Sequence, residues 1–95
     1  FIRSSKDRPF FLYLPHTAVH FPLYPDKGFI GKSPNGLVGD WAQELDASTG
    51  RILDLLRELG LAENTLVIYT SDNGGALNHG SKNTPLRGSK GQTYE

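Results

Sequence analysis

The sequence has 95 residues, and its ten basic and ten acidic side chains give a formal net charge of zero. This length fits one small domain, and the balanced charge gives no global attraction to nucleic acid or to an anionic membrane. No apolar run is long enough to span a bilayer. Cysteine is absent from these residues, which excludes disulfides and thiolate chemistry within them. We therefore expect neither a nucleic-acid partner nor a membrane partner.

The first predicted element is a β-strand over residues 10–14, with the sequence FFLYL. An unbroken apolar run that ends at a proline is typical of a strand buried on both faces, as in a parallel sheet. Residues 15–39 are rich in proline and glycine and predict a long irregular loop. Loops of this length in compact domains are often functional.

An amphipathic helix is predicted over residues 40–59, with Asp40 as its N-cap and Gly60 as a left-handed C-cap. Its apolar side chains recur at steps of three and four residues: Trp41, Leu45, Ile52, Leu55, Leu56 and Leu59. A second buried strand follows over residues 66–70. Strand, helix and strand in this order form a βαβ unit of the α/β class, and ligands of such sheets bind beyond the carboxyl ends of the strands.

Asp72 and Asn73 directly follow the second predicted strand, in the sequence TSDNGG. A carboxylate and an amide oxygen are hard donors that suit calcium or magnesium, although such an ion needs at least six oxygen ligands. Asp, Asn and Gly are also the residues that turns prefer, so an Asx turn is the alternative interpretation. From this pair alone, the turn is the stronger interpretation.

Two histidines, His16 and His20, lie in the loop after the first predicted strand, bracketed by Pro15 and Pro22. The prolines disfavour a helix that would place both histidines on one metal ion. His20 is the better candidate for a proton donor or an anion ligand. A loop histidine that hydrogen bonds to backbone carbonyls is an equally good interpretation of the same residues.

The tail over residues 78–95 is rich in glycine and predicts no regular secondary structure. Between Asp72 and Glu95 it contains no acidic residue, but it carries His79, Lys82, Arg87 and Lys90. A cationic, glycine-rich loop at the carboxyl end of a strand can cradle an anion. The alternative interpretation is a solvated surface loop.

The order of PFFLYLPHTAVHFP, GDWAQELDASTGRILDLLRELGLAENTLVIYTSDNGG and LRGSKGQTYE resembles the formylglycine-dependent sulfatases of the arylsulfatase A-like branch. The resemblance covers residues 9–95 and implies an alkaline phosphatase-like α/β sandwich. It implies that Asp72 and Asn73 bind calcium (magnesium being less favoured), that His20 contacts the sulfate near the leaving oxygen, and that Lys90 binds the sulfate. His16 falls at a position where many members of the family have other residues, so it is left out of the candidate site.

The formylglycine nucleophile of that family arises from a C/S-x-P-x-R segment, which these residues lack; in NTPLR, Asn83 stands at the nucleophile position and cannot serve. The chain begins with Phe1 and closes without a turn or helix, so we expect residues 1–95 to be a fragment of one sulfatase catalytic domain, inactive in isolation. The formylglycine is expected upstream. A two-stranded sheet with one helix buries little surface, and a strand edge left unpaired by truncation favours aggregation, so we also expect the isolated fragment to be poorly stable and to aggregate.

The function implied by the resemblance is hydrolysis of sulfate monoesters, on a sulfated small molecule or glycan, by a secreted, periplasmic or lysosomal enzyme. Two alternatives stay open on the residues themselves. One is another alkaline phosphatase-like hydrolase that acts on phosphate or phosphonate esters, and the other is a non-catalytic homologue that binds anions. The nucleophile region of the gene distinguishes these three functions.

Overall fold

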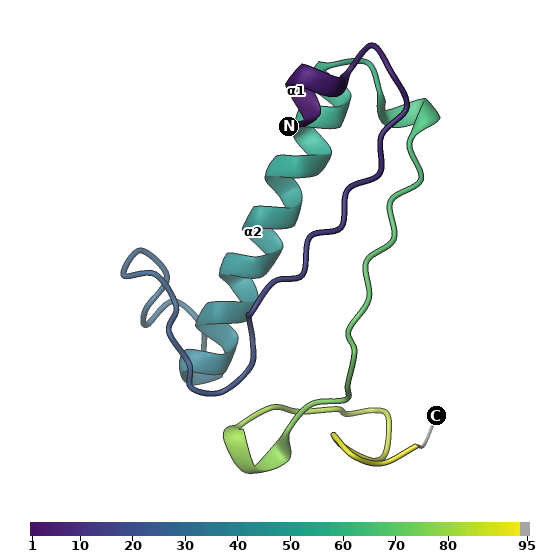
Figure 1. Cartoon of the computed structure of the whole chain (residues 1–95). Helices are drawn as coiled ribbons and strands as arrows, with labels where there is room; N and C mark the ends of the chain where they lie inside the picture. Colours follow the sequence, from purple (N-terminus) through teal and green to yellow (C-terminus); the bar gives the residue numbers. More distant parts are fainter. Residues whose placement is uncertain (94–95) are drawn as a thin grey trace.

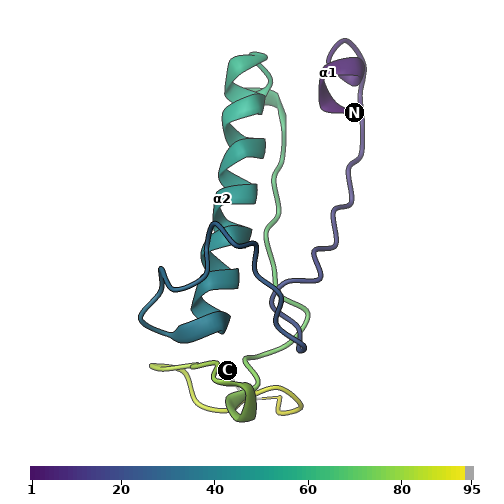
Figure 2. The same cartoon turned by 90° about the vertical axis from the view of Figure 1, so that its left-hand side faces the viewer.

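The computed structural model describes residues 1–93. In chain order, its elements are a short helix α1 (Ile2–Ser5), a long helix α2 (Gly36–Glu58) and two 3-10 helices, η1 (Ala62–Asn64) and η2 (Leu77–His79). The extended segments 10–15 and 66–70 run in one direction, and α2 runs back between them in sequence (Figure 1, Figure 2). This sequence of directions is that of a βαβ crossover.

The two predicted strands are extended but are not paired. Residues 1–93 contain no β-strand, and no backbone hydrogen bond joins segment 10–15 to segment 66–70. The predicted burial of these segments is wrong for the described residues: Phe11 is 87% exposed, Leu66 86% and Ile68 77%. One long helix supplies too little apolar surface to cover both faces of two apolar segments.

Helix α2 begins four residues earlier than the sequence predicts, at Gly36, so Asp40 lies inside the helix and is not its N-cap. Asp40 is 1% exposed, and its carboxylate accepts hydrogen bonds from the backbone N–H groups of Gly31 (2.8 Å) and Ser33 (2.7 Å). These bonds hold the pKa of Asp40 below its ordinary value, because they favour the ionised carboxylate. Asp40 therefore anchors the preceding loop to the helix.

The C-terminus of α2 forms the left-handed cap that the sequence predicts. Gly60 has φ of +68°, and its N–H donates to Arg57 O at 3.0 Å, while Leu61 N–H donates to Leu56 O at 2.8 Å. This pair of bonds is a Schellman motif, which satisfies carbonyls at the end of the helix. The motif turns the chain toward the extended segment 66–70.

The buried apolar core of the described residues is small and consists of Ile2 and Leu56. Near it, Arg3 of α1 forms a bidentate ion pair with Glu58 at the end of α2, with both N–O distances at 2.9 Å. Both side chains are largely exposed, so the pair contributes little stability. Within residues 1–93, no helix has the length and apolar character needed to cross a membrane.

Candidate functional site

The loops that carry the candidate site residues gather at one end of the molecule, near the N-terminus of α2. Both views show the loop around residues 16–22, the turn after segment 66–70 and the tail from residue 79 onward at this end (Figure 1, Figure 2). The sequence predicts this placement, because both extended segments run toward the same end. The site is therefore built from residues far apart in the chain.

Asp72 and Asn73 are exposed at the end of segment 66–70. Ser71 Oγ donates a hydrogen bond to Asn73 O at 2.8 Å. Within residues 1–93, neither the Asp72 carboxylate nor the Asn73 side-chain amide hydrogen bonds to another group. An Asx turn would require the Asp72 carboxylate to accept a nearby backbone N–H, so the structure does not support that interpretation. Both side-chain oxygens are available to a ligand.

The turn at residues 72–75 packs directly against the loop that carries Lys90. Lys90 N–H donates to Gly75 O at 3.1 Å. A Cβ atom on Gly74 would lie 3.2 Å from Ser89 C and 3.3 Å from Lys90 N. Glycine therefore permits a backbone approach that places the lysine loop beside the pair of oxygen donors.

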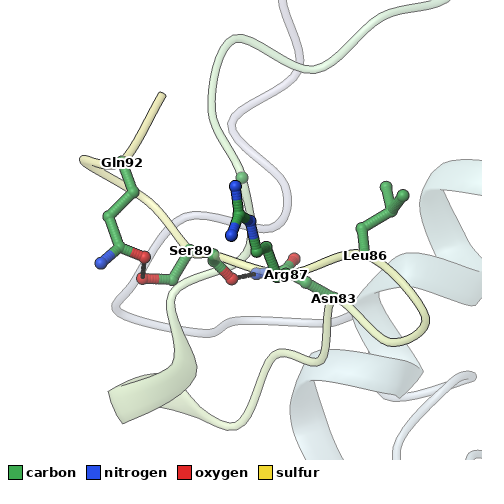
Figure 3. Close-up of a pocket in the computed structure, with 7 residues that line it drawn as sticks. Asn83, Leu86, Arg87, Ser89 and Gln92 are labelled. Atoms are coloured by element: carbon green, nitrogen blue, oxygen red, sulfur yellow. Dashed lines mark hydrogen bonds between the residues drawn. The ribbon is translucent and has the colours of Figure 1, made fainter. Parts of the chain in front are cut away.

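A half-open cavity of about 130 Å³ lies between the turn and this loop. Figure 3 shows Asn83, Arg87, Ser89 and Gln92 around it, with Ser89 Oγ and Gln92 Oε1 at 3.3 Å. Lys90 does not line this cavity, whereas the Arg87 side chain does. The cavity is lined by Gly74, Asn83, Leu86, Arg87, Gly88, Ser89 and Gln92.

His20 is exposed in the loop after segment 10–15, and its Nδ1 lies 2.7 Å from Phe21 O. Because a carbonyl can only accept, this contact assigns the proton to Nδ1 and leaves Nε2 for a ligand. The next residue, Phe21, stacks on His79 of η2, with ring centroids 4.5 Å apart and planes at 14°. This stack joins the histidine loop to the tail.

His16 lies in different surroundings from His20. It lines a second cavity, of about 160 Å³, between its loop and α2, and His20 does not line this cavity. The lining residues are His16, Thr17, Ala18, Trp41, Glu44, Leu45, Ser48 and Arg51.

The donor set of the turn fits a hard divalent cation in part. Asp72 and Asn73 are adjacent oxygen donors without competing side-chain hydrogen bonds among the residues that the structure describes, and calcium takes six to eight oxygen ligands. In the described part of the chain, no cluster of three or more His, Cys, Asp or Glu side chains is placed to hold a metal. These two residues would therefore supply a portion of a coordination shell.

The comparison with family models classifies the chain. The model described as Sulfatase matches residues 1–95. The chain belongs to the sulfatase family. This confirms the family resemblance seen in the sequence, and it places the chain in the alkaline phosphatase-like superfamily to which sulfatases belong.

Several curated sulfatases resemble this chain throughout its length. It is 44% identical over 97 residues to N-acetylgalactosamine-6-sulfatase of Homo sapiens, covering 98% of this chain and 19% of that protein. It is 42% identical over 95 residues to arylsulfatase A of Homo sapiens (97% and 19%) and 41% identical over 103 residues to steryl-sulfatase of Mus musculus (100% and 16%). No solved structure gives a significant match. The chain thus spans about a fifth of the length of these sulfatases.

Sequence reasoning missed one residue that lies between the loops of the candidate site. Asn83 was considered only as a failed nucleophile position, but its side chain lies between the turn at residues 72–75 and the loop before Lys90. The sequence signal that points to it is the double glycine after Asn73, because two small residues there leave room for another side chain.

Proposed function

We propose that residues 1–95 form part of a single sulfatase catalytic domain, an alkaline phosphatase-like α/β sandwich that hydrolyses sulfate monoesters. The observation that carries the proposal is the hydrogen bond from Lys90 N–H to Gly75 O, 3.1 Å long. It joins a segment whose two oxygen donors have no hydrogen-bond partner within residues 1–93 to a segment with a lysine. A pair of oxygen donors next to a segment that carries a cationic side chain suits the anionic sulfate group.

Each candidate residue has a distinct role in this proposal. Asp72 and Asn73 hold calcium, which when bound supplies polarisation of a sulfate oxygen. Lys90 neutralises the sulfate oxygens as a compact point charge. His20, oriented by its Nδ1–H contact with Phe21 O, presents Nε2 to the ester oxygen and, in the imidazolium form with both ring nitrogens protonated, delivers the Nε2 proton to the departing alcohol. The nucleophile, a formylglycine in this family, is expected from residues outside this segment.

The similarity to these relatives supports a role for this chain in binding the sulfate group, and not in recognising the leaving group of the substrate. N-acetylgalactosamine-6-sulfatase and steryl-sulfatase are named for different sulfated compounds, yet the chain is 44% and 41% identical to them. We propose that residues shared across such enzymes bind the sulfate, and that the substrate is a sulfated small molecule or glycan. A secreted, periplasmic or lysosomal location belongs to the same proposal.

The test uses the full-length protein that contains residues 1–95, with 4-nitrophenyl sulfate and 4-nitrophenyl phosphate as matched substrates. We expect hydrolysis of the sulfate ester to dominate, to stop on calcium chelation and to return with added calcium. Preference for the phosphate ester would indicate the phosphate ester hydrolase instead. Sulfate binding without turnover of either ester would indicate the non-catalytic homologue.

A further inference from the structure

The side chain of Asn83 uses its donor and acceptor groups on the two loops of the candidate site. Its Oδ1 accepts the N–H of Gly75 at 2.9 Å. Its Nδ2 donates to Gly88 O at 2.7 Å and to Gly75 O at 3.3 Å. The side chain is half-buried, so these bonds are partly shielded from competing water.

These bonds link the backbone next to the oxygen donors with the backbone next to the lysine. Gly75 lies two residues after Asn73, and Gly88 lies two residues before Lys90. Gly75 O also accepts the Lys90 N–H, so its two lone pairs serve Asn83 and Lys90 together. Hydrogen bonds therefore connect the turn at residues 72–75, Asn83 and the loop that carries Lys90 to one another.

The Asn83 side chain fits against Gly75 because Gly75 has no Cβ atom. A Cβ atom on Gly75 would lie 2.7 Å from Asn83 Oδ1 and 2.8 Å from Ser81 Cβ, which is closer than real Cβ atoms approach other atoms. Glycine at this position is thus needed for the Asn83 contact. The site loses the contact if either partner changes.

We propose that Asn83 is a positioning residue that sets the distance between the cation-binding turn and Lys90. It touches neither the cation nor the sulfate, and it acts through the backbone that carries their ligands. This inference rests on the proposed function. Partners that orient metal ligands typically change metal affinity or activity by about 10–100-fold when mutated, and we expect a similar effect on both calcium and sulfate binding.

The experiment compares Asn83→Ala with Asn35→Ala in the full-length protein. Asn35 is the matched control, because its Nδ2 donates to Gly80 O at 3.4 Å and so ties the same tail to α2 without contacting the turn. The measurements are calcium affinity by calorimetry, KM and kcat for 4-nitrophenyl sulfate, and thermal stability. We expect Asn83→Ala to weaken calcium binding and raise KM by roughly 10-fold or more, and Asn35→Ala to change neither by more than about twofold.

Two further variants keep the test decisive if Asn83→Ala does not fold. Asn83→Asp keeps the acceptor for Gly75 N–H but loses the donor to Gly88 O, and Gly75→Ala removes the space that Asn83 needs. Both should reproduce the joint loss of calcium and sulfate binding. A fall in thermal stability with calcium affinity and KM unchanged would overturn the positioning role.

The calcium measurement also separates this inference from the proposed function. Wild-type protein that binds calcium but hydrolyses no sulfate ester would contradict the function, while weaker calcium binding in Asn83→Ala would still support the positioning role. Wild-type protein that neither binds calcium nor hydrolyses the ester would overturn both.

Discussion

Asp72 is the single carboxylate in the stretch 66–75, and it stands at the end of an extended apolar segment. Its oxygens accept no hydrogen bond within residues 1–93. A carboxylate left without donors at a chain bend is suited to a cation, since a cation compensates its charge more strongly than a single neutral donor. The residue therefore carries the proposed calcium site.

Replacing Asp72 by Asn keeps the size of the side chain and removes its charge. We expect calcium affinity of the full-length protein to fall by roughly tenfold or more, because affinity depends on the charge of the ligand set. Asp46→Asn, on the exposed face of α2, is the control and should leave the affinity unchanged. Equal losses from both changes, measured by calcium titration, would argue against a specific site at Asp72.

His20 offers a prediction that depends on the leaving group of the substrate. If His20 protonates the departing oxygen, His20→Ala should lower kcat by about 10²–10⁴-fold for an alkyl sulfate. The loss should be much smaller for 4-nitrophenyl sulfate, whose leaving group departs without a proton. His16→Ala, which alters the cavity beside α2, serves as the control. An identical loss for both esters would contradict the proton-donor role.

At the scale of residues, the sequence alone indicates some of the candidate site residues and misses another. Asp72, Asn73, His20 and Lys90 were proposed from residue type, position after predicted strands and family resemblance. Asn83 escaped notice because its importance lies in three contacts with backbone groups of Gly75 and Gly88. Hydrogen bonds to backbone groups do not depend on the residue types of the partners. The sequence therefore gives no signal of these contacts, apart from the glycines that leave space for the side chain.

At the scale of elements, the periodicity of apolar residues predicted the body of helix α2 but not the residue at which the helix begins. The apolar spacing and the left-handed Gly60 located the body and the C-terminus of the helix. Asp40 looked like an N-cap, but its carboxylate accepts N–H groups from residues 31 and 33. A side chain that caps a helix and one that anchors a loop have the same chemistry, so residue type alone does not separate them.

The Asp40 anchor predicts a pH dependence of the loop. Its pKa is lower in the folded chain than the ordinary value of 3.8, so its contribution to stability is fully present above about pH 4. The contribution is lost as the pH falls through the still lower folded pKa. We expect Asp40→Asn to destabilise the full-length protein at pH 7, and the difference from wild type to shrink in strong acid.

Amide hydrogen exchange measures the same effect locally. The amides of Gly31 and Ser33 donate to Asp40, so they should exchange faster in Asp40→Asn than in wild type at neutral pH. Amides near the Schellman motif at Gly60 should exchange at the same rate in both proteins. Unchanged protection of Gly31 and Ser33 would contradict the anchor.

At the scale of the whole molecule, the arrangement resembles a crossover whose sheet is incomplete. The two extended segments share a direction (Figure 1), and their apolar side chains, such as Phe11 and Ile68, are largely exposed. The sequence predicted the extended conformation, because it depends on local residue preference. It also predicted a paired and buried sheet, which residues 1–93 do not form, because pairing and burial depend on strands and layers that these residues do not supply.

This exposure predicts the behaviour of the 95 residues as an isolated polypeptide. Unpaired, apolar extended edges favour association with other chains, so we expect concentration-dependent oligomers in sedimentation velocity and strong binding of a hydrophobic dye. Phe11→Lys together with Ile68→Lys should reduce both effects, since charged residues on strand edges oppose pairing. A monodisperse monomer that binds no dye would contradict this expectation.

The measurement that bears most directly on the proposed site is a crystal structure of the full-length protein with calcium and sulfate. We expect calcium at about 2.3–2.6 Å from the Asp72 carboxylate and the Asn73 side-chain oxygen, with sulfate contacting Lys90 Nζ and His20 Nε2. Asn83 should bridge Gly75 and Gly88 as it does here. Calcium bound elsewhere, or sulfate bound away from Lys90 and His20, would contradict the proposed site.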